Sequence, residues 1–358
     1  MSGDTSGYDG LNEARAALAC ALTIDAVRKA VDDERKRIAT AASEGAQAQA
    51  LTRMITGLND AAFRRLIELL DHEQKTAGAC CWIVMGSQGR AEQTLATDQD
   101  NGIILADDAD RAGFRSTVLE LAARVNHALD ACGYPLCRGN VMAGNPECCL
   151  TASEWRSRFA RWIERGDPQA LLNAAIFFDF RHVHGTREPA QNLREWLAEA
   201  ALDNSRFLLQ LAQNALENRP PLGFLRDFEL SARGQHPHTL DLKVNGVQLF
   251  VEAARIYALA TGVTGTGTIE RLDIGGALRR IPAAQIGEWT DSFRFIQTRR
   301  LALNVAQARR GEALHNHLDP DSLSRPERHA LKNAFRQARR LQAQLARDFG
   351  AAAGGFGA

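Results

Sequence analysis

Residues 80–105 constrain the possible fold more than any other part of this chain. The segment begins with an apolar run at 80–85, turns at Gly86 and Ser87, continues through a short polar stretch and ends in a second apolar run at 102–105. Short apolar runs that are bounded by turn residues are typical of buried strands. We therefore predict a strand, a glycine turn, a short polar helix and a second strand, in this order.

Two carboxylates, Asp98 and Asp100, open the second of these strands. On a strand, residues i and i+2 point to the same face, so the two side chains should lie side by side. Neighbouring carboxylates repel each other unless a cation lies between them, and Mg²⁺ prefers a few carboxylates together with substrate phosphates. A glycine turn upstream lets backbone N–H groups approach a phosphate closely. The pattern therefore predicts a metal-dependent site for a nucleoside triphosphate.

The run GSQGRAEQTLATDQDN at 86–101 resembles the nucleotidyltransferases of the DNA polymerase beta superfamily, which share Gly-Ser, a short helix and Asp-X-Asp on the next strand. More narrowly, it resembles the bacterial nucleotidyltransferase domain that is often fused to CBS pairs and cyclic-nucleotide-binding modules. That domain is similar in turn to the uridylyltransferase of the PII signalling protein. One position departs from the family, because Gln88 stands where Glu is usual. Four later segments resemble the helical substrate-binding domain of the same family: IFFDFRHVHG, LDLKVNG, IERL and LDPDSLSRPERHALKNAFRQARRLQ.

The resemblance implies roles for the residues of the motif. Asp98 and Asp100 are expected to bind Mg²⁺, or Mn²⁺ in its place, and Gly86 and Ser87 to hold the β- and γ-phosphates. Arg90, on the short helix, is expected to pair with phosphate. Glu92 is either the partner of Arg90 or a support of the site. The residues expected to support the site are Glu92, Gln93, Thr97, Asn101, Asp179, Arg181 and Asp241.

A third carboxylate is harder to locate. The superfamily usually supplies it from a later strand, where it acts as a base on the acceptor hydroxyl. We predict that strand at 134–143, which contains no acid, and Glu147 just beyond it is the candidate. Either Glu147 reaches the site, or substrate or water accepts the proton, or the domain binds nucleotide without turning it over.

The second half of the chain adds two charged pairs. Asp179 and Arg181 lie in an aromatic run, where an unpaired charge is costly, so we expect them to pair with each other or with another domain. Asp241 and Lys243 precede a predicted helix at 244–260. Either Lys243 faces the triphosphate, as a basic residue does in related enzymes, or Asp241 caps the helix and Lys243 is solvated.

Composition excludes several classes of protein. Lys+Arg and Asp+Glu both number 43, so the chain lacks the broad basic surface that is typical of nonspecific binding to nucleic acid. No apolar run approaches the roughly 18 residues of a membrane-spanning helix, and the polar start is unlike a signal peptide. Seven cysteines without a CxxC pair indicate free thiols in a reducing compartment. We therefore expect a cytoplasmic protein with no nucleic-acid or membrane partner.

The 358 residues suggest two domains and a preface. Apolar residues at three- and four-residue steps predict a helical preface at 1–76, which packs on the rest or forms a homodimer. A nucleotidyltransferase-like domain at 77–150 and a helical substrate-binding domain at 151–350 should follow, with a flexible tail at 351–358. The expected fold class is α+β: a small mixed-sheet, polymerase-beta-like domain followed by an all-helical bundle.

The preferred hypothesis is a nucleotidyltransferase of the EC 2.7.7 type. It would move a nucleoside monophosphate from NTP to a hydroxyl of an unknown acceptor, either a protein or a small molecule, and release pyrophosphate. The resemblance to the PII uridylyltransferase suggests a role in signal transduction. Two alternatives stay open: a weak or inactive NTP-Mg²⁺ sensor module, and a small-molecule enzyme of the aminoglycoside nucleotidyltransferase type.

Overall fold

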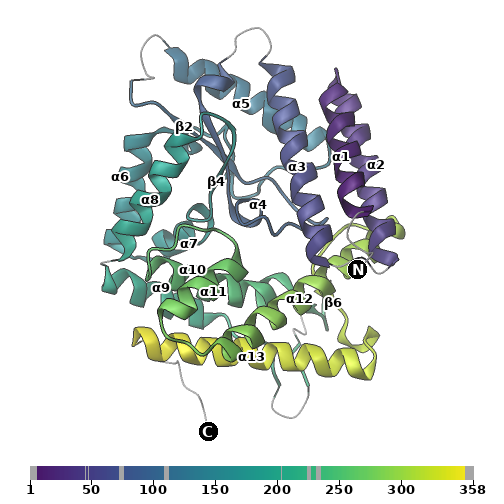
Figure 1. Cartoon of the computed structure of the whole chain (residues 1–358), viewed down its shortest axis with the longest axis vertical. Helices are drawn as coiled ribbons and strands as arrows, with labels where there is room; N and C mark the ends of the chain where they lie inside the picture. Colours follow the sequence, from purple (N-terminus) through teal and green to yellow (C-terminus); the bar gives the residue numbers. More distant parts are fainter. Residues whose placement is uncertain are drawn as a thin grey trace. The chain divides into compact units, whose positions relative to one another are not determined.

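A computed structural model describes residues 6–44, 46, 48–71, 76–108, 113–202, 204–223, 227–230 and 235–350. The chain divides into two compact units, each built from two segments (Figure 1). The sheet-bearing unit comprises Met1–Ala160 and Ile176–Leu197, and the helical unit comprises Arg161–Ala175 and Ala198–Ala358. The predicted tail at 351–358 lies outside the described residues.

Three long helices begin the sheet-bearing unit and lie side by side in Figure 1: α1 (Ser6–Cys20), α2 (Ile24–Ser43) and α3 (Ala48–Leu70). The Thr23 side chain accepts a hydrogen bond from the Ala26 N–H and so caps the start of α2. The apolar residues at helical spacing are buried, which confirms the predicted helical preface. They are Val27, Val31, Ile38, Leu51, Ile55, Leu58, Phe63 and Leu66.

A four-stranded mixed sheet follows, in the order β3-β2-β1-β4. Strand β1 (Cys81–Val84) runs antiparallel to both β2 (Asn101–Leu105) and β4 (Arg181–Gly185), whereas β2 runs parallel to β3 (Cys149–Thr151). All residues of β1 and β2 are buried. This small mixed sheet and the helical region after it confirm the predicted α+β class.

Aromatic side chains attach helices to this sheet. Phe63 of α3 meets Trp82 of β1 edge-on, with ring centroids 5.9 Å apart. Trp155 of α6 (Ala152–Arg165) donates its indole N–H to the Ile103 carbonyl at 2.9 Å. The other elements here are α4 (Gly86–Gly89), α5 (Phe114–Ala131), and the short turns η1 (Ala77–Ala79) and η3 (Pro146–Cys148).

Three details of the predicted sheet are wrong. No strand forms at 134–143, because this segment reverses direction: the Asn140 N–H bonds the Cys137 carbonyl at 2.9 Å, and Asn140 has φ of 55°. The later strand of the sheet is β3 instead, which runs parallel to β2. The edge strand β4 was not predicted. Asp98 and Asp100 lie in the loop before β2, not on the strand.

The helical unit is built around α10 (Gln248–Leu259), most of whose side chains are buried. The helices packed with it are α9 (Ser205–Glu217), α11 (Thr268–Leu278), α12 (Ala283–Arg309) and α13 (Arg325–Phe349). Ser324 and Glu327 form a capping box at the start of α13. A π-helical turn, η4 (Lys243–Val247), leads into α10, and a short turn η5 (Pro320–Ser322) precedes α13.

A two-stranded sheet of β5 (Leu240–Asp241) and β6 (His317–Leu318) completes the helical unit. Helices α6, α7 (Pro168–Phe177) and α8 (Glu188–Leu202) carry the chain from one unit to the other. Across the part of the chain that the structure describes, no helix is long and apolar enough to cross a membrane.

Candidate metal and nucleotide site

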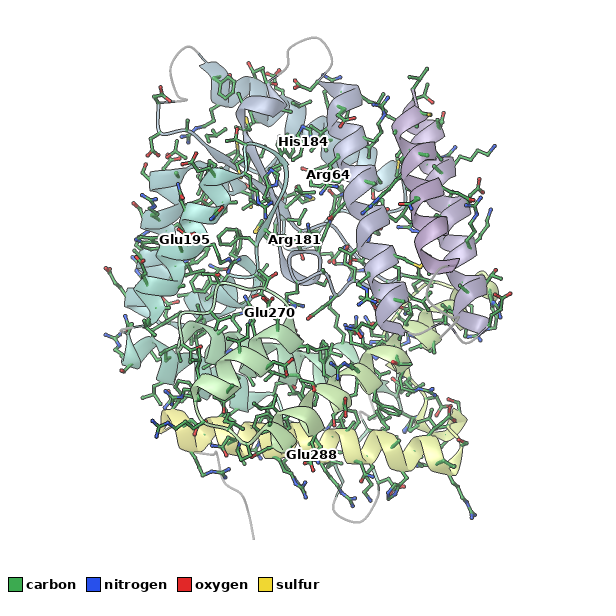
Figure 2. All side chains as sticks on the ribbon, viewed as in Figure 1. Arg64, Arg181, His184, Glu195, Glu270 and Glu288 are labelled. Carbon is green, nitrogen blue, oxygen red and sulfur yellow. The ribbon has the colours of Figure 1, made fainter. Side chains whose placement is uncertain are left out.

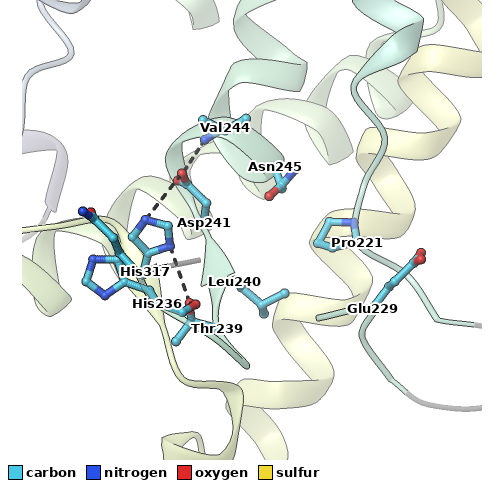
Figure 3. Close-up of a pocket in the computed structure, with 10 residues that line it drawn as sticks. Pro221, Glu229, His236, Thr239, Leu240, Asp241, Val244, Asn245 and His317 are labelled. Carbon is cyan, nitrogen blue, oxygen red and sulfur yellow. Dashed lines mark hydrogen bonds and ion pairs between the residues drawn. The ribbon is translucent and has the colours of Figure 1, made fainter. Parts of the chain in front are cut away.

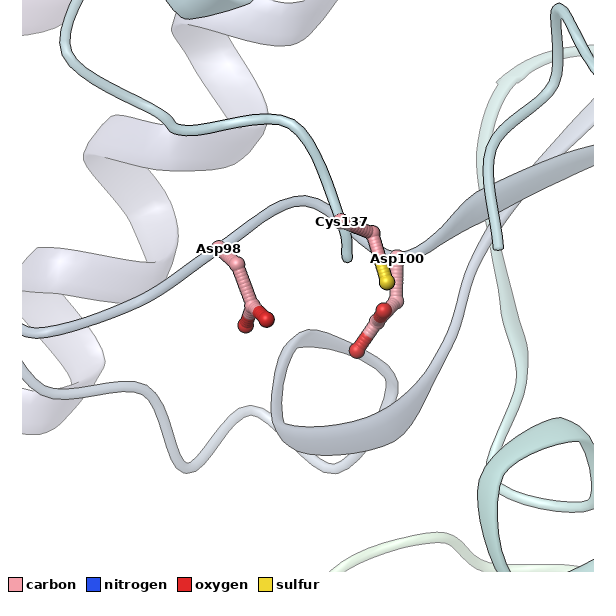
Figure 4. A group of neighbouring side chains, drawn as sticks. All are labelled: Asp98, Asp100 and Cys137. Carbon is pink, nitrogen blue, oxygen red and sulfur yellow. The ribbon is translucent and has the colours of Figure 1, made fainter. Parts of the chain in front are cut away.

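Two carboxylates and a thiol meet beside the start of β2 (Figure 4). Ligand atoms of Asp98, Asp100 and Cys137 all lie within 4.8 Å of one another. The acids come from the loop before β2, and the cysteine comes from the turn that replaces the predicted third strand. The structure therefore brings the two sequence-predicted acids together and adds a group that the sequence did not indicate.

The thiol of Cys137 is held in its protonated form. Burial raises its pKa to about 11, and the neighbouring Asp100 carboxylate adds to the effect by repelling the thiolate. The side chain is nevertheless only partly buried, unlike those of Cys80, Cys81 and Cys148. Cys137 is thus a neutral, partly accessible sulfur beside two carboxylates.

Gly86 forms the wall of the site opposite Asp100. It begins α4 with φ of 57°, a conformation that L side chains rarely adopt, and a Cβ there would lie 2.8 Å from Asp100 Oδ2. The N–H groups of Gly86, Ser87 and Gln88 belong to the first turn of α4, where no intrahelical acceptor exists. The Gly-Ser turn therefore places backbone donors beside the carboxylates, and Gly86 itself adds no side chain there.

Glutamine and asparagine side chains fix the loop that carries the acids. Gln99, between the two aspartates, donates to the backbone carbonyls of Asn126 and Tyr134, both at 3.0 Å. Asn126 in turn donates to Gln99 Oε1 at 2.8 Å and to Asn101 Oδ1 at 2.9 Å. These side chains are buried. Since each amide both donates and accepts, the network locks the backbone on either side of Asp100.

Gln93 and Thr97 hold the other end of this loop. Gln93 donates to Thr97 Oγ1 at 2.9 Å and accepts from Asn59 of α3 at the same distance. Asn59 also accepts a 2.8 Å hydrogen bond from the Tyr134 hydroxyl. Sequence analysis missed Asn59, Gln99, Asn126 and Tyr134. Gln99 had a signal in its place between the acids, whereas the others are distant in sequence and had none.

Arg90 lies between two carboxylates of the chain. Its guanidinium donates to Glu92 at 2.9 Å and to Asp179 at 2.7 Å. Burial alone would lower the pKa of Arg90, but Asp179 and Glu92 outweigh it and raise that pKa above its usual value. The ion pair with Glu92 that the sequence suggested is present. Gly89 makes the contact with Asp179 possible, because a Cβ at Gly89 would overlap the Asp179 carbonyl oxygen.

The sequence predicted that Asp179 and Arg181 pair either with each other or with another domain. They do not pair with each other. Arg181 instead donates to Asp60 of α3 at 2.8 Å and to the Gln88 carbonyl at 3.1 Å. Gln88 also donates to Asp60, at 3.1 Å. Arg181 and Arg64, both labelled in Figure 2, lie on the same aspartate, with Arg64 Nη2 3.8 Å from Asp60 Oδ2. The ion pair of Asp60 with Arg181 thus connects α3 to β4. The ion pair of Asp179 with Arg90 connects the segment before β4 to the turn that follows α4.

Glu147 is not part of the acid group. It lies in η3, and its exposed carboxylate pairs with Arg158 of α6. Among the described residues, the group of possible metal ligands consists of Asp98, Asp100 and Cys137. It contains no third carboxylate.

Asp241 and Lys243 belong to the helical unit. The Asp241 carboxylate accepts from the N–H groups of Lys243 and Val244 at 2.8 and 3.0 Å, so it caps the turn that leads into α10. The Lys243 side chain is exposed. Of the two predicted roles, the structure shows the capping of the helix by Asp241.

The same aspartate lines a cavity of about 420 Å³ in the helical unit (Figure 3). His236 and His317 stack with ring centroids 4.2 Å apart, and His317 Nε2 lies 4.0 Å from Asp241 Oδ2. Burial lowers the pKa of His317, although Asp241 opposes that effect. The other residues that line the cavity are Pro221, Glu229, Gln235, Thr239, Leu240, Val244 and Asn245.

Comparison with family models identifies the chain. The model described as "Putative nucleotidyltransferase DUF294" matches residues 33–169, and the model described as "Putative nucleotidyltransferase substrate binding domain" matches residues 205–349. Together they cover most of the chain, which therefore belongs to this nucleotidyltransferase family and carries its C-terminal domain. A comparison with curated proteins gives no match.

Proposed function

We propose that the protein transfers a nucleoside monophosphate from a nucleoside triphosphate to an acceptor hydroxyl. The observation that carries this proposal is the convergence of Asp98, Asp100 and the Gly86 turn in a chain of a nucleotidyltransferase family. The acceptor oxygen would form a bond to the α-phosphorus, while the bond from that phosphorus to the leaving pyrophosphate breaks. Such chemistry requires mainly positioning and neutralisation of charge.

The donor set fits a divalent cation. Asp98 and Asp100 would hold Mg²⁺ or Mn²⁺, since both ions prefer carboxylate oxygens. When bound, the ion supplies positive charge to the triphosphate and to the attacking oxygen. Gly86 supports this assignment, because its missing Cβ leaves room beside Asp100 Oδ2.

The chain's own groups have separate tasks in this proposal. The first-turn N–H groups and the hydroxyl of Ser87 bind the phosphates. Arg90 positions the turn through Glu92 and Asp179, which already occupy its guanidinium. With no third carboxylate in the acid group of the described residues, water or the substrate accepts the hydroxyl proton.

The cavity of the helical unit supports a small-molecule acceptor. It lies within residues 205–349, the segment that matches the substrate-binding domain. Its volume of about 420 Å³ falls in the range of ligand pockets. Glu229 and Asp241 supply negative charge, and the lowered pKa of His317 keeps that imidazole neutral near pH 7. We therefore propose an acceptor that carries hydroxyls and a positive charge.

A sensor of NTP and metal is the second candidate function. The observation that favours it is the missing third carboxylate at the acid group. A sensor would bind NTP saturably without releasing pyrophosphate, whereas a transferase would do both.

Transfer of label from each of the four α-labelled NTPs, with Mg²⁺ or Mn²⁺ and a cell lysate as the source of acceptor, tests the proposal. We expect the double variant Asp98→Asn with Asp100→Asn to lose about a hundredfold or more of the transfer, since the ion supplies several kcal/mol of charge stabilisation. Label in the low-molecular-mass fraction supports the small-molecule acceptor, and label in a protein band contradicts it.

The matched control is Asp32→Asn with Asp33→Asn, two exposed acids of α2 in the same unit. This control should transfer label at the wild-type rate. Equal transfer by the wild type and the Asp98/Asp100 variant would remove the site assignment. Saturable NTP binding without any pyrophosphate release would establish the sensor instead.

A further inference from the structure

The third side chain that offers a metal ligand beside Asp98 and Asp100 is a cysteine, Cys137. Cys137 Sγ lies within 4.8 Å of ligand oxygens of both Asp98 and Asp100. The turn that presents it is fixed, because the Asn140 N–H bonds the Cys137 carbonyl at 2.9 Å and the Asn101 N–H bonds the Val141 carbonyl at 3.1 Å. The backbone that carries the thiol is therefore attached to the start of β2, beside the aspartates.

Cys137 differs from the other cysteines in where it lies. Cys80, Cys81, Cys132, Cys148 and Cys149 are buried, and Cys20 is exposed on α1. Cys137 is partly exposed, and it is the cysteine that joins a group of metal-ligating side chains among the described residues. A solvent-borne cation that reaches the two carboxylates would therefore also meet the sulfur.

We propose that Cys137 is a metal ligand and that it gives this site a preference for a borderline or soft divalent cation of the Zn²⁺ class over Mg²⁺. The inference rests on the metal site of the proposed function and refines it. Thiolate sulfur binds Zn²⁺, Co²⁺ and Cd²⁺ strongly, whereas Mg²⁺ takes oxygen ligands. On binding, a metal–sulfur bond forms and the thiol proton passes to solvent, with no change in oxidation state.

The competing arrangement is a thiol that only donates a hydrogen bond to Asp100. In that case a metal at the aspartates would leave the sulfur uncoordinated, so alkylation of Cys137 would proceed no more slowly than without metal. The two arrangements differ in what Zn²⁺ does to Cys137, and the difference can be measured without any transfer reaction.

Protection from alkylation is the first test. The full-length protein is treated with iodoacetamide in Zn²⁺, in Cd²⁺, in Mg²⁺ or without metal, and modification of each cysteine is read by peptide mass spectrometry. We expect Zn²⁺ and Cd²⁺ to slow modification of Cys137 about tenfold or more, because coordinated thiolate is withdrawn from reaction. Mg²⁺ should leave Cys137 reactive, and the exposed Cys20 should stay reactive in every condition.

Co²⁺ binding gives a second, spectroscopic test. Bound Co²⁺ should show a sulfur-to-metal charge-transfer band that Cys137→Ser abolishes and the matched control Cys20→Ser retains. Cys137→Asp supplies a third oxygen ligand, so it should raise the ratio of Mg²⁺ to Zn²⁺ affinity about tenfold or more. A folded Cys137→Asp protein keeps the proposal testable if Cys137→Ser is unstable.

The outcomes separate this proposal from the proposed function. If metal binds through Asp98 and Asp100 but Cys137 stays fully reactive in Zn²⁺, the sulfur ligand is overturned and the transferase proposal stands. If the charge-transfer band depends on Cys137 but no NTP supports transfer, the sulfur ligand stands and the transferase proposal fails. If neither Zn²⁺ nor Co²⁺ binds, the sulfur ligand is overturned.

Discussion

Two pairs of aspartates in the sheet-bearing unit show opposite uses of the same side chain. Asp60 and Asp179 are buried, and each accepts a hydrogen bond from an arginine, at 2.8 and 2.7 Å. Asp98 and Asp100 converge with each other and with the thiol of Cys137, and each of the three can bind a metal ion. Arginines hold the first pair, whereas the second pair belongs to a group of metal-ligating atoms.

We infer from this difference that one pair of aspartates stabilises the fold and the other pair binds a metal. A buried carboxylate with its arginine fixes neighbouring elements, and removing either partner leaves an uncompensated charge. Carboxylates whose oxygens gather within 4.8 Å of each other and of a sulfur offer ligands to a cation from solution. Stability should therefore depend on Asp60 and Asp179, and metal binding should depend on Asp98 and Asp100.

Asp179→Ala gives the largest expected change in stability. It leaves Arg90, whose side chain is 10% exposed, without one of its two carboxylates, and breaking a buried ion pair in this way costs about 3–5 kcal/mol. We expect the free energy of unfolding of the sheet-bearing unit to fall by that amount, as measured by denaturant unfolding followed through tryptophan fluorescence.

Asp98→Asn is the matched comparison. It changes an aspartate of the acid group, so we expect the free energy of unfolding to stay within about 0.5 kcal/mol of the wild type. Equal destabilisation by Asp179→Ala and Asp98→Asn would break the distinction between the two pairs. Asp179→Asn, which keeps the size of the side chain, isolates the effect of its charge.

Gly86→Ala should affect metal binding more than stability. The positive φ of Gly86 costs an L residue about 1–2 kcal/mol, and the added Cβ would lie 2.8 Å from Asp100 Oδ2. Because the carboxylate must then move, we expect metal affinity to fall about tenfold to a hundredfold in calorimetric titration.

Gly78→Ala is the control for this variant, because a Cβ at Gly78 meets no atom within 4 Å. It should bind metal as the wild type does. Wild-type metal affinity in Gly86→Ala would show that the position of the Asp100 carboxylate does not matter for binding.

The sequence predicted what is local. Gly86, Ser87, Asp98 and Asp100 lie within one short run, where spacing along the chain decides which groups meet, and the structure brings this run together as a turn beside a carboxylate pair. The helices also followed from local periodicity. The domain boundaries and the roles of the site residues remain predictions.

Contacts between residues far apart in the chain could not be predicted from the sequence. The segment at 134–143 was predicted as a strand before the turn at Gly144. Val141 and Ala143 are buried, as strand residues would be, but a turn at Asn140 excludes pairing with a neighbouring strand. Strand β4 was missed because its register with β1 depends on contacts about a hundred residues apart. Cys137 had no motif around it, so only the fold shows that its sulfur joins the two aspartates.

Three neighbouring histidines of the helical unit extend the comparison to a second cluster of titratable side chains. Lowered pKa values favour the neutral forms of His315 and His317. His236 stacks on both His315 and His317, with centroids 4.4 and 4.2 Å apart. Burial lowers the pKa of His315, and repulsion from His236 and His317 adds to the effect, while Glu312 opposes it. Burial and His236 likewise lower the pKa of His317, against Asp241.

These shifts predict the smallest effect, a loss of stability in mild acid. The pKa values of His315 and His317 in the folded protein lie below the unfolded value of about 6.5. At a pH between the folded and unfolded pKa values, the unfolded chain therefore binds more protons than the folded protein does. The free energy of unfolding consequently falls as the pH drops below about 6.5. Partial exposure keeps the loss well below that of Asp179→Ala. His236→Asn removes the ring that both others contact, so its melting temperature should depend less steeply on pH. Identical pH slopes in both proteins would show that the imidazoles do not repel one another, and the contrast with the acid pair would then fail.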